Sequence, residues 1–158
     1  MLIAYREATS QDAPAMARAR ANDAAAGPAD PRIAAYLDGR HHPQQALAPR
    51  VAYVALDDTG VAGYIAGHLT TRFGCDGELQ YLYVARHLRR RGVAGELLRQ
   101  LARWFSTHRA RRVCVNVDVD SPAATPFYES HGATPLDRFW FAWDDVGAVL
   151  RMPSTTEP

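Results

Sequence analysis

Apolar residues gather in six short segments, where they alternate with polar residues or form β-branched and aromatic runs, and both patterns are typical of β-strands. The predicted strands cover residues 2–8, 51–56, 61–73, 78–84, 111–119 and 138–143. The sequence DDTG joins the second and third segments as a compact turn, so these strands are expected to pair as an antiparallel hairpin. In ELQYLYV, the fourth segment, both alternating sets of positions are largely apolar, which predicts a central strand.

A different pattern, with apolar residues at steps of three and four, predicts an amphipathic helix after Gly92 that continues to about His108. Its apolar face comprises Val93, Leu97, Leu98, Leu101, Trp104 and Phe105. Because this helix comes directly after the predicted central strand, we expect it to cross over to a neighbouring strand of the same sheet.

Three shorter helices are expected over residues 13–26, 33–37 and 121–132. Thr9 or Ser10, together with Asp12, can cap the first of them, which is rich in alanine. Two prolines and a glycine separate the first two helices, and residues 38–50 are expected to form a loop. The order of elements, β-α-α-β-β-β-α-β-α-β, predicts a mixed α/β sandwich.

With 158 residues the chain suits one domain, expected over residues 1–150 and followed by a disordered tail over 151–158. The net charge of +1 argues against a global attraction to nucleic acid or to an anionic membrane. No apolar run approaches the ~20 residues of a membrane span and no signal-peptide pattern begins the sequence, so we expect a cytoplasmic protein. Cys75 and Cys114 form no close-spaced metal pattern, and no metal is expected.

Arg89, Arg90 and Arg91 come at the N-terminus of the long predicted helix. Cations are unfavourable there, because unpaired backbone N–H groups already make that end electropositive. A turn that directs several N–H groups at one point before a helix forms an anion site, and a glycine such as Gly92 lets the backbone approach the ligand closely. Arginines become favourable once a phosphate is bound. The segment therefore predicts an anion-binding loop, the alternative being a solvated basic loop.

Two sequence motifs, one following the other along the chain, resemble those of the GCN5-related N-acetyltransferases. In ELQYLYVARHLRRRGVAGELL, the phosphate-binding pattern Q/R-x-x-G-x-G/A of that family is matched by Arg89, Gly92 and Ala94. Downstream, SPAATPFYESHGA resembles the family pattern N-x-x-A-x-x-F/L-Y-E-x-x-G-F. The matching residues are Ala124, Phe127, Tyr128, Glu129 and Gly132. Ser121 stands where Asn is commoner, and Ala133 where Phe is commoner.

The resemblance implies an α/β fold of the mixed α+β kind, with a central, mostly antiparallel sheet of six to seven strands flanked by about four helices. It also implies that acetyl-coenzyme A is bound as the acetyl donor. The residues that it assigns to coenzyme binding are Leu82, Tyr83, Val84, Arg89, Arg90, Arg91, Gly92, Val93, Ala94, Ser121 and Tyr128. Leu82 and Val84 would act through their main chain, which the family frees by opening the sheet between this strand and the strand in residues 111–119.

Acetyl transfer to an amine requires a group that removes a proton from the ammonium and a second that supplies one to the departing thiolate. The resemblance assigns the second role to Tyr128; the alternative is a tyrosine packed on the core, with Phe127 as its buried neighbour. Glu78 is the candidate base, and the alternative is a solvated carboxylate at a strand end.

Asp118, Asp120 and His68 are further candidates for the base, and the two aspartates could instead attract a cationic acceptor. Cys75 lies in a predicted turn without a visible partner, so direct attack in a ternary complex is expected in place of a covalent intermediate.

The predicted function is an acetyl-coenzyme A-dependent N-acetyltransferase that acts on the primary amine of a small molecule or of a peptide N-terminus. The alternative is a coenzyme A-binding sensor or partner protein of the same fold without turnover. A third hypothesis is a nucleic-acid-binding module that uses residues 86–91, and the net charge of +1 disfavours it. Many relatives dimerise, so a homodimer is one possible state, with no nucleic acid or membrane as partner.

Overall fold

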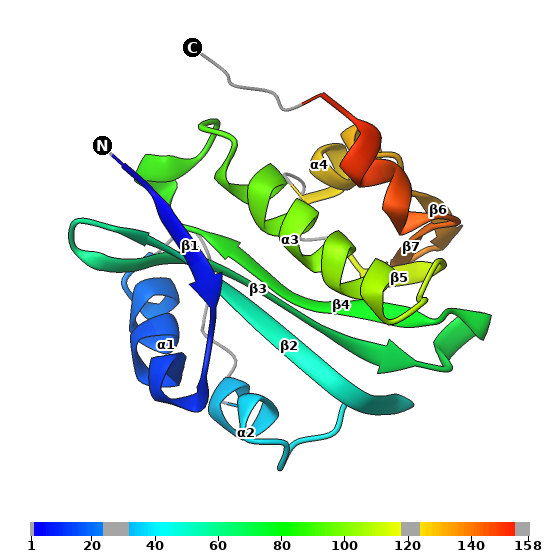
Figure 1. The fold of residues 1–158 in the computed structure, drawn as a ribbon, viewed down its shortest axis with the longest axis horizontal. Helices are drawn as coiled ribbons and strands as arrows, with labels where there is room; N and C mark the ends of the chain where they lie inside the picture. Colours follow the sequence, from blue (N-terminus) through cyan, green and yellow to red (C-terminus); the bar gives the residue numbers. More distant parts are fainter. Residues whose placement is uncertain (1, 24–31, 118–123, 154–158) are drawn as a thin grey trace.

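The computed structural model describes residues 2–23, 32–117 and 124–153. Within them, seven strands form one sheet in the order β1-β2-β3-β4-β5-β7-β6 (Figure 1). The strands are β1 (Ala4–Glu7), β2 (Ala46–Asp57), β3 (Gly60–Thr70), β4 (Gly77–Val84), β5 (Val113–Asn116), β6 (Thr134–Asp137) and β7 (Trp140–Trp143). The pairing of β4 with β5 is parallel, and the other pairings are antiparallel. The predicted fold class is confirmed.

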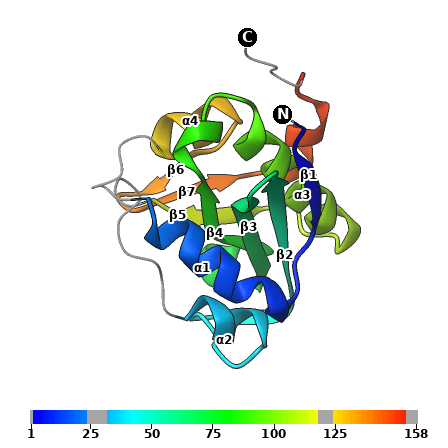
Figure 2. The same cartoon turned by 90° about the vertical axis from the view of Figure 1, so that its left-hand side faces the viewer.

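Helices cover both faces of the sheet (Figures 1 and 2). They are α1 (Ala13–Ala21), α2 (Ile33–Leu37), α3 (Val93–Thr107) and α4 (Ala124–Ser130). α1 and α2 pack on one face, and α3 packs on the opposite face as the crossover between β4 and β5. A Cβ at Gly77 would collide with the Phe105 ring, so the glycine lets α3 lie close to the sheet.

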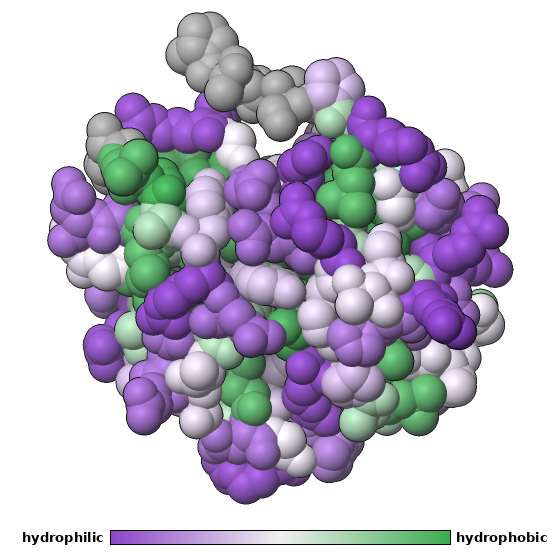
Figure 3. Space-filling view, in the orientation of Figure 1, coloured by the Kyte–Doolittle hydropathy of each residue, from purple (hydrophilic) through white to green (hydrophobic). Residues whose placement is uncertain are grey.

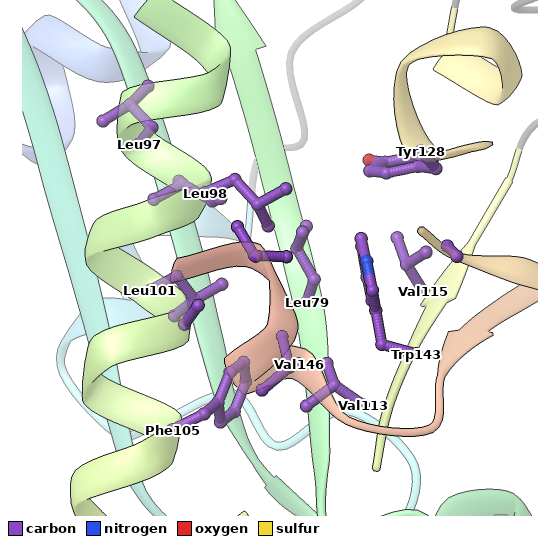
Figure 4. Packing of buried hydrophobic residues seen from close by; sticks show 14 of the residues in the cluster. Leu79, Leu97, Leu98, Leu101, Phe105, Val113, Val115, Tyr128, Trp143 and Val146 are labelled. Atoms are coloured by element: carbon purple, nitrogen blue, oxygen red, sulfur yellow. The ribbon is translucent and has the colours of Figure 1, made fainter. Parts of the chain in front are cut away.

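The larger of the apolar clusters lies between α3 and the sheet and continues to β7 (Figure 4). Its buried members include Ile65, Leu79, Leu97, Leu98, Leu101, Phe105, Val113, Val115, Tyr128 and Trp143. A second cluster, which contains Met16, Ile33, Val54, Tyr64 and Tyr83, lies under α1 and α2. The helix spacing read from residues 93–105 therefore identifies the buried face of α3 correctly, and Trp104 is only half-buried at its margin.

Several predicted bounds differ from those in the structure, and one strand was not predicted. The strand predicted over residues 61–73 ends at Thr70, and Arg72–Gly74 form a 3-10 turn. The first helix ends at Ala21, with Asn22 as its C-cap, and not near residue 26. Residues 46–50 were expected in a loop but belong to β2, where Ala46 pairs with Thr70 and Arg50 pairs with His68 across an irregularity in register. β6 was not predicted, because its TPLD sequence carries a proline; an edge strand tolerates one, since half of its backbone has no ladder partner.

On the face shown in Figure 3, hydrophobic residues form small patches separated by polar ones. None of the helices in the described part of the chain combines the length and apolar character needed to cross a bilayer.

Candidate functional site

The strands β4 and β5 are paired over only three residues, and this is the main irregularity of the sheet. Gly77, Glu78 and Leu79 pair with residues 113–115, whereas β4 continues to Val84 without a further β5 partner in the described residues. Figure 4 shows the two strands diverging beyond Leu79. The expected opening of the sheet between these strands is present, and it leaves residues 80–84 without a β5 partner in the described residues.

A bulge in β4 determines which side chains face each layer. Leu79 pairs with Gly67 and Tyr81 pairs with Ala66, so Gln80 is the extra residue. Leu79, Leu82 and Val84 consequently pack toward α3, whereas Tyr81 and Tyr83 pack with the cluster under α1 and α2. Strict alternation along ELQYLYV, the sequence-based expectation, is therefore wrong beyond Leu79. The Oε1 atom of Gln80 is buried and has no hydrogen-bond partner in the described residues.

The residues between β4 and α3 form the loop for which the sequence predicts anion binding. A 3-10 turn (Arg86–Leu88) leads to Arg90 and Gly92, which have φ angles of 65° and 78°. The first backbone N–H groups of a helix have no intrahelical acceptor, and at the start of α3 the N-cap residue, Gly92, has no side chain that could accept from them. A hollow of about 50 Å³ lined by Gly92, Gly95 and His131 adjoins this helix start.

Arg89 and Tyr83 share one acceptor and anchor the loop to α1. Arg89 Nη2 donates to Asp23 Oδ2 at 3.1 Å, and Arg89 Nε donates to the Val84 carbonyl at 3.1 Å. The Tyr83 hydroxyl contacts the same Asp23 oxygen at 3.0 Å and the Ala19 carbonyl at 3.1 Å. The Tyr83 side chain is thus occupied on the α1 face.

The other members of the predicted coenzyme set fall into two groups. Arg90 and Arg91 are exposed on the loop, and Ala94 is half-buried in the first turn of α3. The side chain of Val93 is part of the core, so its main chain alone is available. Ser121, together with Asp118 and Asp120, lies outside the described residues.

A second anchor ties the loop to the β2–β3 turn. His87 Nε2 and Asp57 Oδ2 are 2.8 Å apart, and Asp57 also accepts hydrogen bonds from the amide and hydroxyl of Thr59. These contacts lower the pKa of Asp57 from its ordinary value of 3.8 to about 2.

We expect the Asp57 anchor to stabilise the fold above about pH 4 and to lose this effect between pH 4 and 2. A carboxyl whose pKa falls on folding contributes its stabilisation above the unfolded pKa and loses it as the pH falls through the folded one. Asp57→Asn should therefore flatten the fall of the free energy of unfolding in that window, measured by urea denaturation at each pH. Asp58→Asn, in the same turn but exposed, serves as the control and should leave the pH dependence as in wild type.

Glu78 is buried, with 4% of its surface exposed, and is therefore not a solvated carboxylate at a strand end. Arg72 Nε donates to Glu78 Oε1 at 3.0 Å, and His68 Nε2 lies 3.8 Å from the same oxygen. His68 is directly opposite Glu78 in the antiparallel β3–β4 register. The arrangement places an ionisable carboxylate at the closed end of the β4–β5 opening, beside one guanidinium and one imidazole.

Tyr128 lies on α4 across the opening from β4. Its ring stands edge-on to Trp143, with centroids 5.8 Å apart, and Figure 4 shows its hydroxyl directed from α4 toward β4. Burial raises the pKa of Tyr128, so the phenol keeps its proton at neutral pH. Tyr128 is buried in the core, as the packing alternative expects, whereas Phe127, its expected buried neighbour, is half-buried.

Two neighbours of the candidate base could not be found from the sequence. Arg72 falls near the end of the strand predicted over residues 61–73, and Tyr36, which contacts the base only through His68, falls in a short helix far away in the chain. Neither carries a motif. Both cysteines are buried, and burial raises the pKa of the Cys75 and Cys114 thiols, which are therefore neutral. No group of three metal-ligating side chains occurs among the residues that the structure describes.

Comparisons with known proteins agree with this geometry. The sequence profile of the acetyltransferase (GNAT) family matches residues 18–133. A comparison with curated proteins gave no match.

Three solved structures illustrate the similarity of fold. A protein described as a member of the GNAT acetyltransferase family from Desulfovibrio desulfuricans has a TM-score of 0.71 and 18% identity, over 92% of this chain and 99% of its own. An acetyltransferase from Thermus thermophilus has a TM-score of 0.69 and 19% identity, over 90% of this chain and 96% of its own. The PaiA N-acetyltransferase of Thermoplasma acidophilum, solved with coenzyme A, has a TM-score of 0.64 and 16% identity, over 90% of this chain and 99% of its own.

Proposed function

Because the chain belongs to the GNAT acetyltransferase family, we propose that it transfers an acetyl group from acetyl-coenzyme A to the primary amine of a small molecule or of a peptide N-terminus. The observation that carries the proposal is the β4 edge, unpaired with β5 in the described residues beyond Leu79, which leads directly to the glycine-capped start of α3. This edge offers backbone hydrogen bonds to an extended ligand, and the helix start offers N–H groups to an anion. A long ligand with a pyrophosphate at one end fits both.

Each part of the proposed site has its own task. The N–H groups at the start of α3, with the arginines of the loop, bind the pyrophosphate, while the main chain of Leu82 and Val84 holds the extended arm. Acetyl-coenzyme A supplies an acetyl group activated as a thioester. Glu78 accepts a proton from the acceptor ammonium, which makes the amine nucleophilic, and Tyr128 donates a proton to the thiolate that departs. The new amide nitrogen gives up its extra proton, which restores the Tyr128 phenol. The amine attacks directly, within a ternary complex.

The experiment that tests this function is a calorimetric titration of acetyl-coenzyme A into the wild-type protein and the Arg89→Ala variant, followed by a screen of amines for thiol release. Binding in the micromolar range that weakens about tenfold in the variant, or ~1.4 kcal/mol, supports the anion loop. Binding without thiol release from any amine would favour the non-catalytic sensor. The absence of binding would contradict the proposal. The cytoplasmic location, the single domain and the homodimer stay predictions.

Tyr128→Phe is expected to lower kcat by roughly tenfold at pH 7, with less loss above about pH 8.5, because a thiolate of that pKa departs without an acid at higher pH. The coenzyme Kd should stay within about twofold of the wild-type value. Tyr53→Phe, at a half-buried tyrosine of β2, is the control. If the ratio of the wild-type kcat to the Tyr128→Phe kcat does not change with pH, the role of Tyr128 is packing and not proton donation.

A further inference from the structure

A continuous row of polar side chains is buried behind the candidate base. The Tyr36 hydroxyl of α2 lies 2.8 Å from His68 Nδ1, and His68 Nε2 lies 3.8 Å from Glu78 Oε1. Both Tyr36 and His68 have no exposed surface. The Nε2 atom of His68 has no hydrogen-bond partner in the described residues. Buried polar atoms are rarely left unpartnered, so an unpartnered one that faces a carboxylate requires an explanation.

The contacts of His68 determine which of its ring nitrogens carries the proton. Burial raises the pKa of Tyr36, so its hydroxyl remains protonated, and Nδ1 is its hydrogen-bond partner. If the hydroxyl donates to Nδ1, the proton of a neutral imidazole is on Nε2 and points toward Glu78. The opposite tautomer would direct a lone pair at the Glu78 oxygen and leave the hydroxyl proton without an acceptor. Of the two neutral tautomers, the Nε2–H form is the one that satisfies both neighbours.

Other groups around Glu78 are fixed in their charge. Arg72 stacks on Trp140, with 4.7 Å from its guanidinium carbon to the ring centroid, and donates to the Gln44 carbonyl at 2.9 Å. Cys114 of β5 pairs with Glu78 in register, and Cys75 lies beside Cys114, but both thiols are neutral. Arg50 of β2 lies over the Tyr36 ring, at 4.7 Å, and pairs with His68 in the β2–β3 register.

We propose that Tyr36 and His68 form a positioning pair, in which Tyr36 holds the Nε2–H tautomer and His68 presents this N–H to Glu78 so that the buried carboxylate stays ionised and able to accept a proton. At 3.8 Å the contact is a favourable charge–dipole interaction, longer than a hydrogen bond. When Glu78 accepts the proton of the acceptor ammonium, it becomes a neutral acid and the amine is released as a base; water then removes that proton and restores the carboxylate. Neither Tyr36 nor His68 changes its own protonation in this cycle.

The catalytic part of the inference rests on the proposed function, so the first measurement does not depend on turnover. In ¹⁵N-labelled wild-type protein, the two ring nitrogens of His68 should show the Nε2–H tautomer throughout the neutral range. The ¹³C signal of the Glu78 side-chain carboxyl should titrate at a pH roughly half to one unit higher in His68→Phe than in wild type, because an N–H that favours the charged form has been removed. An Nδ1–H tautomer, or an unchanged titration, would overturn the proposal.

The second measurement uses pH profiles of kcat/KM for variants that separate charge from packing. In His68→Phe, the acid limb of the kcat/KM profile should move to higher pH by the same amount as the ¹³C titration of Glu78. His68→Gln, whose amide can accept from Tyr36 and donate toward Glu78 but does not ionise, should keep the wild-type limb. Ile65→Val, on the opposite face of β3, is the packing control and should leave the limb in place.

These outcomes distinguish the two proposals. A wild-type protein that binds acetyl-coenzyme A but releases no thiol with any amine would defeat the proposed function, while the ¹³C titration still decides whether His68 holds the charge of Glu78. If His68→Gln behaves as His68→Phe in both measurements, the N–H dipole is not the cause and the positioning pair is wrong.

Discussion

Gly92→Glu is expected to weaken acetyl-coenzyme A binding by about 100-fold, or ~2.7 kcal/mol. Gly92 has a φ of 78° at the N-cap of α3, a conformation that costs a residue with a side chain roughly 1–2 kcal/mol. The new carboxylate would also stand where the proposed pyrophosphate binds, and juxtaposed like charges cost several kcal/mol. Calorimetric titration of the coenzyme into the purified variant measures the effect, which should be smaller at high salt.

Two control variants separate charge from backbone strain. Gly92→Gln introduces the same strain without the charge and should lose much less affinity than Gly92→Glu. Gly39→Glu places the same change at an exposed glycine of similar φ, 76°, in the segment after α2, where a Cβ would meet nothing within 4 Å. Its coenzyme affinity should equal that of wild type. If Gly92→Glu binds acetyl-coenzyme A as tightly as wild type does, the loop before α3 is not part of the coenzyme site.

Glu78→Gln is expected to lower kcat by roughly 100-fold or more, the usual contribution of a general base, with little change in coenzyme affinity. The amide keeps the size of the side chain but cannot accept a proton from the acceptor. The residual rate of the variant should rise steadily up to the pKa of the amine, because only amine that has already lost its proton in solution can react. The acid limb of wild type, which reflects ionisation of Glu78, should be absent. Steady-state thiol release from pH 6 to 10 measures both effects.

The same substitution also leaves the guanidinium of Arg72 without its charged partner, at a site where Glu78 is 4% exposed. Breaking a buried pair is destabilising, so thermal unfolding must accompany the kinetics, and rates are compared well below the midpoint. Glu129→Gln, on the exposed side of α4, makes the same chemical change outside the site and should leave kcat as in wild type. A Glu78→Gln variant within about threefold of the wild-type kcat would move the role of base to another group.

Local patterns were sufficient to predict much of the fold. The spacing of apolar residues predicts a helix from Gly92 to about His108 and its buried face, which the structure has as α3 (Val93–Thr107), and the DDTG turn predicts the β2–β3 hairpin. Both features depend on contacts between neighbours in sequence, so they follow from the periodicity of side chains along a helix or a strand. The arginines before α3 and the glycine at its N-cap likewise predict the anion-binding loop from local charge and backbone geometry.

The chemistry around Glu78 could not be obtained in that way. The bulge at Gln80 turns Tyr81 and Tyr83 to the opposite face from the one that alternation predicts, and no residue type in ELQYLYV marks it. Burial of Glu78 likewise depends on Arg72 and His68, which lie on other segments of the chain.

The sequence by itself therefore determined the family, most of the elements and the position of the loop before α3, because each is encoded by residues close together in the chain. Only the tertiary structure decided that Tyr36, His68 and Glu78 meet in one buried row. These residues belong to α2, β3 and β4, and only strand register and helix packing bring them together. The environment that sets the charge of a buried carboxylate is a sum over such neighbours in space.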